Sequence, residues 1–289
     1  MSTPGQVTVP VVRAAKGATP LVMVTAYDAP TARIADDAGV DMILVGDSVA
    51  MVVLGYDDTL QVTMDDMAHH TAAVARTKPR ALVVGDLPWL SYHLGEADAV
   101  ANAARLIRSG AQCVKLEGGA KRVPVVRAIT DAEIPVMGHI GLTPQSLHAL
   151  GGFKVQGRTA EAARLLVADA EALVEAGCFA LVLECVPDEV AQLVTETVPV
   201  PTIGIGAGAA CDGQVLVIHD LLGLEDRITP KFVRRYATLK GVATEAVAAF
   251  AADVRARRFP GPDEGYRLAD GAAEELGLYG GGARASMSA

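Results

Sequence analysis

The sequence predicts an α/β fold, a single (β/α)8 TIM barrel with an N-terminal arm and a C-terminal tail. Short apolar runs alternate with helical stretches about eight times, and 289 residues suit one such barrel. We expect the arm over residues 1–18, the catalytic barrel over 19–260 and the tail over 261–289, with a disordered end. A doubly wound open sheet is the alternative, because the sequence does not show a reversal of strand order.

The strands are expected where apolar runs are continuous, as in parallel sheets that are buried on both faces. These runs cover residues 20–26, 42–45, 81–84, 111–117, 134–137, 179–184, 201–206 and 214–219. Most of them end in glycine or a polar residue, and such barrels carry their chemistry at these carboxyl ends.

The helices are recognised by their ends. Pro30 at a first turn and Gly39 as a stop bound a helix over 29–38, and Thr63 has Asp66 three residues on, as in a capping box. Further helices are expected over 96–109, 123–130, 159–176, from 187 onward, and over 230–256 as a long closing helix. The arm is expected to have little structure of its own, and residues 49–62 to form a loop.

Composition excludes several classes of protein. Hydrophobic residues make up 51% of the chain, too many for a disordered protein, and a net charge of -9 argues against a nucleic-acid partner. No apolar run has membrane-spanning length, and the start of the chain lacks the pattern of a signal peptide. The four cysteines form no CxxC pair and are interpreted as reduced thiols. We therefore expect a cytoplasmic protein with no membrane partner.

The segment Lys115–Gly119 is the first candidate site. Alternation along a strand places Lys115 and Glu117 on one face and Leu116 on the other. The two glycines that follow suit a tight exit or a backbone that lies close to a ligand. A cation beside an anion at the end of a strand indicates either an active site or an internal ion pair at the barrel rim.

Two strands end alike, in an apolar run followed by Gly and Asp. Because the ends of neighbouring parallel strands lie roughly 5 Å apart, Asp47, Asp86 and Glu117 should converge. Carboxylates this close repel unless one is protonated or a cation lies among them. Oxygen ligands that leave room for water and substrate favour Mg²⁺ over Ca²⁺. Helix capping is the alternative for Asp47, but it does not explain three converging acids.

Three other side chains extend the candidate site. Glu184, at the end of the sixth strand, is a candidate general base, with a rim ion pair as the alternative. Lys115 would supply positive charge to an anionic substrate or a developing enolate. His139 is either a substrate contact or a hydrogen-bonded core imidazole.

The glycine-rich run Gly204–Gly208 follows the seventh strand. It resembles the phosphate-binding loop of many barrels, but it contains no Lys or Arg, and its glycines would equally let a bulky substrate approach. Trp89 and Tyr92 are expected to pack at the rim rather than to line the pocket.

Several motifs together resemble one known family. They are Thr25–Asp28 (TAYD), Leu44–Ser48 (LVGDS), Asp86–Pro88 (DLP), Val114–Gly119 (VKLEGG), Gly138–Gln145 (GHIGLTPQ), Leu183–Pro187 (LECVP), and Gly204–Gly208 followed by Cys211–Gln214 (CDGQ). In this order, from about Lys16 to Pro260, the chain resembles the ketopantoate hydroxymethyltransferase (3-methyl-2-oxobutanoate hydroxymethyltransferase) family. Two features depart from the family pattern, namely Trp89 in place of a smaller aromatic residue and the tail after Pro262.

The resemblance implies a (β/α)8 barrel that assembles into a homodecamer and acts in pantothenate and coenzyme A biosynthesis. It implies that 5,10-methylenetetrahydrofolate donates a one-carbon unit to 3-methyl-2-oxobutanoate, through a Mg²⁺-stabilised enolate, giving 2-dehydropantoate. Carried over by position, the metal ligands would be Asp47, Asp86 and Glu117, and the keto acid contacts would be Asp47, Ser48, Asp86 and Lys115. Glu184 would accept the proton.

Three alternatives stay open. A Mg²⁺-dependent C–C lyase or mutase acting on another 2-oxo acid would use the same acids with a different electrophile. Lys115 would be a Schiff-base nucleophile in a second alternative. The third is a catalytically silent binding or assembly barrel, which the intact set of acids disfavours.

Overall fold

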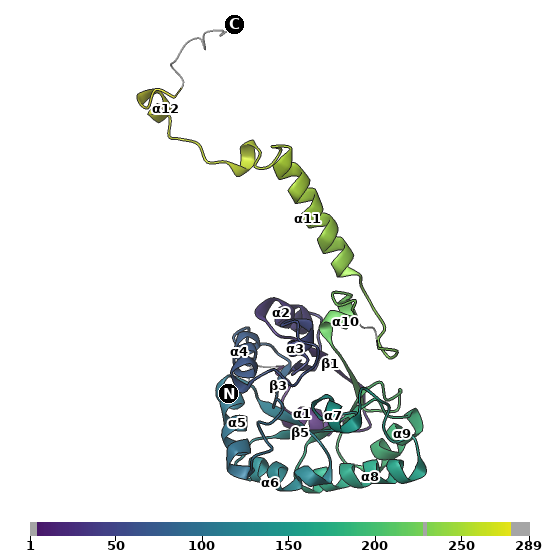
Figure 1. The fold of residues 1–289 in the computed structure, drawn as a ribbon. Helices are drawn as coiled ribbons and strands as arrows, with labels where there is room; N and C mark the ends of the chain where they lie inside the picture. The colour runs from purple at the N-terminus through teal and green to yellow at the C-terminus, as the bar shows by residue number, and fades with distance from the viewer. Residues whose placement is uncertain (1–4, 228–229, 279–289) are drawn as a thin grey trace. The chain divides into compact units, whose positions relative to one another are not determined.

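The computed structural model describes residues 5–227 and 230–278, and the chain divides into two compact units, Met1–Thr238 and Leu239–Ala289. In the first unit, eight parallel strands close into a barrel in sequential order, with β8 pairing back to β1 (Figure 1). The strands are β1 (Leu21–Thr25), β2 (Met42–Val45), β3 (Leu82–Asp86), β4 (Cys113–Glu117), β5 (Val136–Gly141), β6 (Ala180–Glu184), β7 (Thr202–Ile205) and β8 (Gly213–Leu216). The predicted TIM barrel is therefore confirmed, and the open sheet is excluded.

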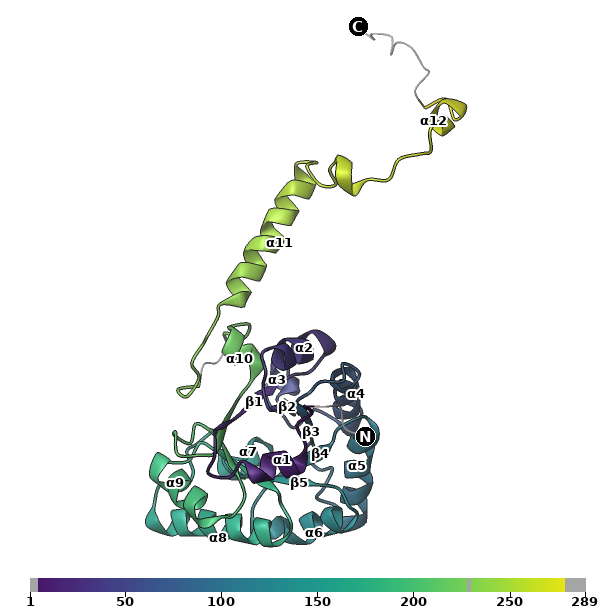
Figure 2. The same cartoon turned by 180° about the vertical axis from the view of Figure 1, so that it is seen from behind.

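Helices α2, α4, α5, α6, α8 and α9 surround the strands of this unit (Figures 1 and 2). The helices of the first unit are α1 (Val9–Ala14), α2 (Ala29–Asp37), α3 (Val49–Val52), α4 (Met64–Ala75), α5 (Glu96–Arg108), α6 (Val123–Asp131), α7 (Leu147–Leu150), α8 (Ala160–Glu175), α9 (Asp188–Thr197) and α10 (Ile218–Leu222). The capping box predicted at Thr63 is present: its side chain accepts from the backbone N–H of Asp66, whose carboxylate accepts from the N–H of Thr63.

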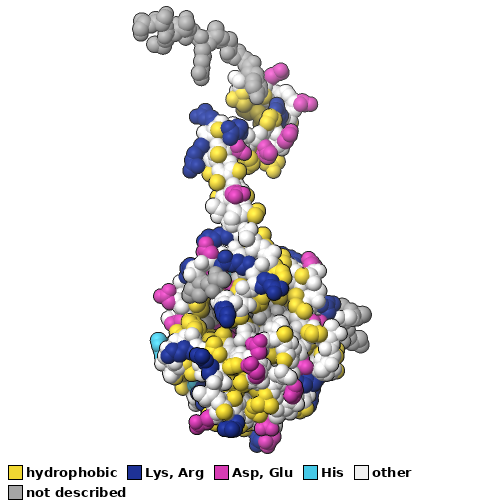
Figure 3. All heavy atoms as spheres, turned by 90° about the vertical axis from the view of Figure 1, so that its right-hand side faces the viewer, with side chains coloured by type: hydrophobic (Ala, Val, Ile, Leu, Met, Phe, Trp, Pro, Cys, Tyr) yellow, Lys and Arg dark blue, Asp and Glu magenta, His cyan; other side chains and the backbone are white. Residues whose placement is uncertain are grey.

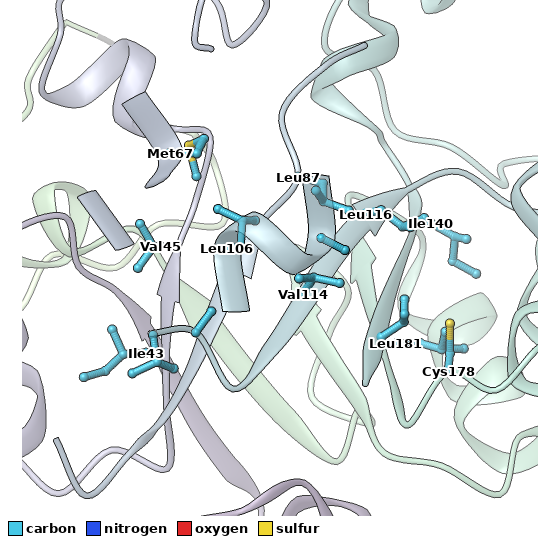
Figure 4. Close-up of a cluster of buried hydrophobic side chains, with 14 of the residues drawn as sticks. Ile43, Val45, Met67, Leu87, Leu106, Val114, Leu116, Ile140, Cys178 and Leu181 are labelled. Carbon is cyan, nitrogen blue, oxygen red and sulfur yellow. The ribbon is translucent and has the colours of Figure 1, made fainter. Parts of the chain in front are cut away.

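Two apolar layers hold the barrel together. The outer layer lies between strands and helices, and Figure 4 shows part of it, including Val114 and Leu116 of β4 near Leu106 of α5. The inner layer fills the barrel with side chains such as Met42 and Met137. Leu116 belongs to the outer layer, whereas Lys115 and Glu117 on either side of it contribute to the site described below. The alternation predicted for this strand is therefore confirmed.

Several boundaries differ from the predictions, four of them at helices. Residues of the arm form α1, and α3 lies within the predicted loop 49–62. His219, expected in the eighth strand, lies in α10, and the predicted 230–256 helix begins only at Leu239. Three of these elements are helices of at most six residues, which are too short to show a hydrophobic period in the sequence.

The arm closes the amino end of the barrel. Val7 and Val12 belong to the inner apolar layer, and the N–H of Val7 donates to the carbonyl of Arg80. Lys16 Nζ lies 2.9 Å from Asp212 Oδ2, and Asp212 also accepts hydrogen bonds from backbone N–H groups of Gly17 and Thr202. We call Lys16 and Asp212 the arm latch, because they join the end of the arm to the start of β8.

The second unit contains α11 (Leu239–Arg255), a 3-10 turn (Pro262–Glu264) and α12 (Ala272–Glu275). The units reflect contacts within one copy of the chain, so the predicted boundary after residue 260 stays a prediction. The end that was expected to be disordered, residues 279–289, lies outside the described residues. None of the described helices is both long and apolar enough to cross a bilayer. On the face of the first unit shown in Figure 3, acidic and basic side chains are interspersed.

The arm latch generates a prediction about stability. Burial alone would raise the pKa of Asp212, but the N–H groups of Thr202 and Gly17 and the ammonium of Lys16 lower it. A carboxyl whose pKa is lower in the folded state stabilises that state above its unfolded pKa, and this contribution is lost as the pH falls through the folded value. Asp212→Asn should therefore lower the free energy of unfolding by roughly 1–3 kcal/mol at neutral pH.

Thermal melts across pH measure this effect. The difference between wild type and Asp212→Asn should be full at pH 7 and shrink below about pH 4, near the unfolded pKa of Asp. Asp131→Asn, at the exposed end of α6, is the matched control and should change stability little. A wild-type advantage that persists unchanged to pH 2 would contradict the assignment.

Candidate active site

Strand register brings the polar side chains together at the carboxyl ends of β3 to β6. Asp86 of β3 lies opposite Lys115 of β4, and Glu117 of β4 lies opposite His139 of β5. Residues at the same register of neighbouring parallel strands point to the same face. Glu184 ends β6 and pairs with Gly141 of β5. Gly141 lies two residues after His139, so Glu184 points to the same face as His139. The predicted convergence of β3 and β4 is therefore confirmed, and β5 and β6 extend it.

These side chains form a chain of buried ion pairs. Lys115 Nζ lies 2.7 Å from Asp86 Oδ1. His139 lies between two acids, with Nδ1 3.4 Å from Glu117 Oε1 and Nε2 3.2 Å from Glu184 Oε2. Asp86, Lys115, Glu117 and His139 are each less than 5% exposed. His139 is thus the buried, paired imidazole of the second alternative, and it bridges the candidate base and a candidate metal ligand. A contact with substrate stays a prediction.

Asp47 follows β2 and joins this cluster from the other side. Its backbone N–H donates to Asp86 Oδ2 over 3.1 Å, and its carboxylate accepts from Gln145 Nε2 over 2.9 Å. The short helix α3 after it has Ser48 as N-cap residue and no side-chain capping bond. The capping alternative for Asp47 is therefore wrong, and its carboxylate faces the other acids.

Burial and the close approach of the acids to one another shift their pKa values. Burial, Asp86 and Glu117 raise the pKa of Asp47 well above its usual range. Burial likewise raises the pKa of Asp86, although Lys115 opposes the change. Burial alone would raise the pKa of Glu117, but the hydrogen bond with His139 and the charge of Lys115 lower it. The acids of the cluster therefore outnumber its cations, Lys115 and His139, and their negative charge is only partly neutralised.

The acids of the cluster favour the protonated forms of Lys115 and His139. Burial alone would lower the pKa of Lys115, but Asp86, Glu117 and Asp47 together raise it. Burial and Lys115 oppose protonation of His139, yet the adjacent carboxylates of Glu117 and Glu184 raise its pKa to about 9. An amine must lose its proton to attack a carbonyl, so the Schiff-base alternative for Lys115 is disfavoured.

The donor chemistry fits Mg²⁺. Among the described residues, no set of three or more His, Cys, Asp or Glu side chains is placed to hold one metal ion. Mg²⁺ does not require such a set, because it is usually bound by one or two carboxylates and completed by water and substrate oxygens. The buried carboxylates of Asp47 and Asp86, both with raised pKa, would be relieved by a divalent cation.

Ser48 is positioned by a buried tyrosine. Its hydroxyl lies 2.8 Å from that of Tyr27, which follows β1 and is almost fully buried. Tyr27 in turn packs against His219 of α10, with ring centroids 5.5 Å apart. Ser48 lies beside Asp47 on the wall of the cavity described next, and its role as a substrate contact stays a prediction.

A cavity of about 620 Å³ opens at the carboxyl ends of the strands. Its walls include all seven residues predicted for the site, Asp47, Ser48, Asp86, Lys115, Glu117, His139 and Glu184. Its outer part is lined by Tyr56, Phe153, Lys154, Lys231 and Phe232, among others. The volume is typical of a small-molecule site.

The glycine motifs serve close packing. A Cβ on Gly119 would lie 2.0 Å from Asp169 Cγ, and the Asp169 carboxylate accepts from the N–H of Ala120. A Cβ on Gly206 would lie 2.7 Å from the Phe232 ring, and one on Gly208 would lie 2.5 Å from Asp188 Cγ. An acidic side chain against Gly208 is unfavourable for a phosphate, so this loop does not have the character of a phosphate cradle.

Backbone strain lies next to Glu184. Cys185, which follows it, has a φ of 46°, a conformation that is uncommon for a residue with a side chain. The Glu184 carbonyl accepts from the N–H of Leu142, and a Cβ on Gly141 would lie 2.3 Å from the same carbonyl. Strain of this kind is maintained where the surrounding structure holds a functional residue in place.

Two residues of the site were missed or misread in the sequence. Gln145 contacts both Asp47 and Glu117, although only its place in the GHIGLTPQ motif drew attention to it. Tyr92, expected to pack at the rim, is buried and hydrogen-bonds to Gln145. Trp89, by contrast, is 42% exposed and does not line the cavity. No local pattern marks Gln145 or Tyr92, because their partners are distant in the sequence.

The fold and the site define a class of protein, a TIM-barrel enzyme with a small-molecule cavity and buried acids at the carboxyl ends of its strands. The chain belongs to the ketopantoate hydroxymethyltransferase family, whose model matches residues 6–262. It is 60% identical over 258 residues to 3-methyl-2-oxobutanoate hydroxymethyltransferase of Oleidesulfovibrio alaskensis, with 89% of each chain covered. It is 56% identical over 272 residues to the enzyme of that name from Syntrophobacter fumaroxidans, covering 94% of this chain and 96% of that one.

Solved structures of other proteins share the fold. Phosphoenolpyruvate phosphomutase from Streptomyces platensis subsp. rosaceus superposes with a TM-score of 0.60 at 15% identity, covering 94% of this chain and 96% of that one. A 2,3-dimethylmalate lyase of the PEP mutase/isocitrate lyase superfamily gives 0.54 at 18% identity, covering 90% and 92%. At these identities the likeness establishes the barrel alone.

Proposed function

We propose that this protein transfers a hydroxymethyl group from 5,10-methylenetetrahydrofolate to 3-methyl-2-oxobutanoate, giving 2-dehydropantoate for pantothenate and coenzyme A biosynthesis in the cytoplasm. The observation that carries the proposal is the meeting of Asp47, Asp86, Glu117 and Glu184 with Lys115 in one cavity. The relatives reported above, which share more than half of its residues, carry the name of this reaction.

Each side chain then has a chemical role. Of the carboxylates of Asp47, Asp86 and Glu117, one or two would supply the protein's direct oxygen ligands to Mg²⁺, with water and substrate oxygens completing the set. When bound, Mg²⁺ would act as a Lewis acid toward the keto oxygen. Ser48 and Lys115, with Asp47 and Asp86, bind and orient the keto acid, and the Lys115 ammonium offsets the negative charge that develops.

Glu184 removes the proton at C3 of the keto acid. Positioned general bases typically contribute 10²–10⁴-fold to such steps. His139 lies 3.2 Å from the Glu184 carboxylate and holds it in orientation. The resulting carbanion equivalent forms a C–C bond to the one-carbon unit, whose two bonds to folate nitrogens break. Water supplies the oxygen of the new hydroxyl group, and tetrahydrofolate leaves.

The outer part of the cavity supports a second, larger substrate. The keto acid fills only the inner part of a 620 Å³ space. The aromatic rings of Phe153 and Phe232 suit a flat heterocycle, and Lys154 and Lys231 suit carboxylates of a glutamate tail.

An activity assay tests the proposal. Purified protein should consume 3-methyl-2-oxobutanoate and methylenetetrahydrofolate only with Mg²⁺, and EDTA should abolish turnover until Mg²⁺ is restored. Mass spectrometry of the product identifies 2-dehydropantoate. Turnover of another 2-oxo acid without tetrahydrofolate would instead favour the lyase or mutase alternative, whereas no Mg²⁺-dependent binding of keto acid by calorimetry would favour a silent barrel.

Glu184→Gln should abolish deuterium exchange at C3 while keto acid binding is retained, because the amide keeps the shape of the carboxylate but accepts no proton. Proton NMR of the keto acid in D₂O measures the exchange, and calorimetry measures binding. Glu189→Gln, in the first turn of α9, is the control and should exchange at the wild-type rate. Normal exchange by Glu184→Gln would remove this residue from the role of base.

Self-association into a homodecamer is also proposed. One face of α11 carries Val242, Val247, Phe250 and Val254, which are 44–66% exposed, and apolar stripes of this kind are typical of helices that pack against another surface.

Sedimentation velocity of the full chain should give a decamer, and Phe250→Asp should shift it to smaller species while Glu245→Gln does not. A wild-type chain that sediments as a monomer at micromolar concentration would refute the proposal.

A further inference from the structure

Gln145 joins three strand ends through one side chain and its own backbone. It lies in the 3-10 turn Pro144–Ser146 that follows β5 and is 5% exposed. Its Nε2 donates to Asp47 Oδ2, after β2, and to the carbonyl of Leu87, after β3, each over 2.9 Å. Its backbone N–H donates to Glu117 Oε2, at the end of β4, over 3.0 Å.

Tyr92 fixes which way the Gln145 amide faces. The backbone N–H of Glu117 donates to the Tyr92 hydroxyl over 3.2 Å, so the single hydroxyl hydrogen is free to be donated onward. It points to Gln145 Oε1, at 2.6 Å. The amide oxygen is thereby assigned to Tyr92, and both amide hydrogens remain for Asp47 and Leu87.

We propose that Gln145, oriented by Tyr92, is a positioning residue that holds the carboxylates of Asp47 and Glu117 in the geometry in which they bind the divalent cation. This inference rests on the proposed function, because it assigns a task within the same site. Both carboxylates accept from N–H groups of one residue, so Gln145 links their positions. Hydrogen bonds to metal-ligating carboxylates commonly tune metal affinity 10- to 100-fold.

A purely structural role of Gln145 predicts different results. If Gln145 only filled space, an unbranched apolar side chain of similar length would serve as well. If its hydrogen bonds only stabilised the fold, their loss would lower the melting temperature and leave the affinity for metal unchanged. The two roles are therefore separated by measuring metal binding and stability on the same variants.

The experiment measures the dissociation constant of Mn²⁺ by electron paramagnetic resonance, on full-length protein stripped of metal, with and without 3-methyl-2-oxobutanoate. Gln145→Met should weaken Mn²⁺ binding about 10- to 100-fold. Tyr92→Phe, which removes one hydroxyl, should weaken it less, because the amide keeps its donors but loses its fixed orientation. In both variants kcat should recover in part at saturating metal.

Gln112→Met is the matched control. Gln112 precedes β4 at the amino end of the barrel, and its Oε1 accepts from the N–H of Val83 over 2.9 Å. This variant loses a comparable hydrogen bond far from the carboxyl ends, so it should melt earlier and bind Mn²⁺ like the wild type. Thermal melts of all variants show which of them fold.

The outcomes separate the inference from the proposed function. Wild-type protein that binds no Mn²⁺ would refute the metal-dependent function itself. Wild-type binding together with unchanged Mn²⁺ affinity in Tyr92→Phe and Gln145→Met would refute the positioning role alone. If Gln145→Met does not fold, unchanged affinity in the folded Tyr92→Phe variant refutes it.

Discussion

Repulsion among buried carboxylates is the constraint on which the site depends. Parallel register delivers Asp86 and Glu117 to one end of the barrel, and Asp47 reaches the same point from β2. Burial removes the water that would screen them, so each acid raises the energy of the next. Lys115 and His139 offset part of this cost. The negative charge that they leave uncompensated can attract a cation, and such a cation can in turn bind an anionic substrate.

The rest of the barrel makes that strained arrangement tolerable. The outer apolar layer fixes the strands against helices, and side chains such as Leu116 anchor each strand on the face opposite the charges. A rigid framework is required, because mobile strands would let the acids move apart into water. The positive φ of Cys185 beside Glu184 belongs to the same pattern, in which global packing holds a locally unfavourable conformation.

Much of this could be read from the sequence, for reasons that differ by element. Continuous apolar runs predicted all eight strands because strands buried on both faces leave an unbroken signal. The position of Lys115 and Glu117 on one face followed from alternation alone, and the convergence of Asp47 and Asp86 followed from strand adjacency. Short helices such as α1 and α3 escaped because they contain no full hydrophobic period.

The supporting residues of the site could not be predicted in the same way. Gln145 acts on Asp47, 98 positions away, and neither residue carries a local sign of the other. Tyr92 was expected to pack at the rim, because nothing near it in the sequence indicates its hydrogen bond to Gln145. The Gly118–Gly119 pair was interpreted as a tight exit or a backbone close to a ligand, and in the structure Gly119 makes room for Asp169. Interactions between distant positions are set by the closed fold, so they become visible only with it.

The arm latch has a consequence for how this barrel can change. The arm seals the amino end with Val7, Val12 and the Lys16–Asp212 ion pair of the latch, whereas every predicted reacting group lies at the other end. The residues that stabilise the fold at the amino end and those predicted to react thus lie at opposite ends of the barrel. Substitutions at the sealed end can adapt the protein to a new temperature or acidity while its chemical specificity is preserved.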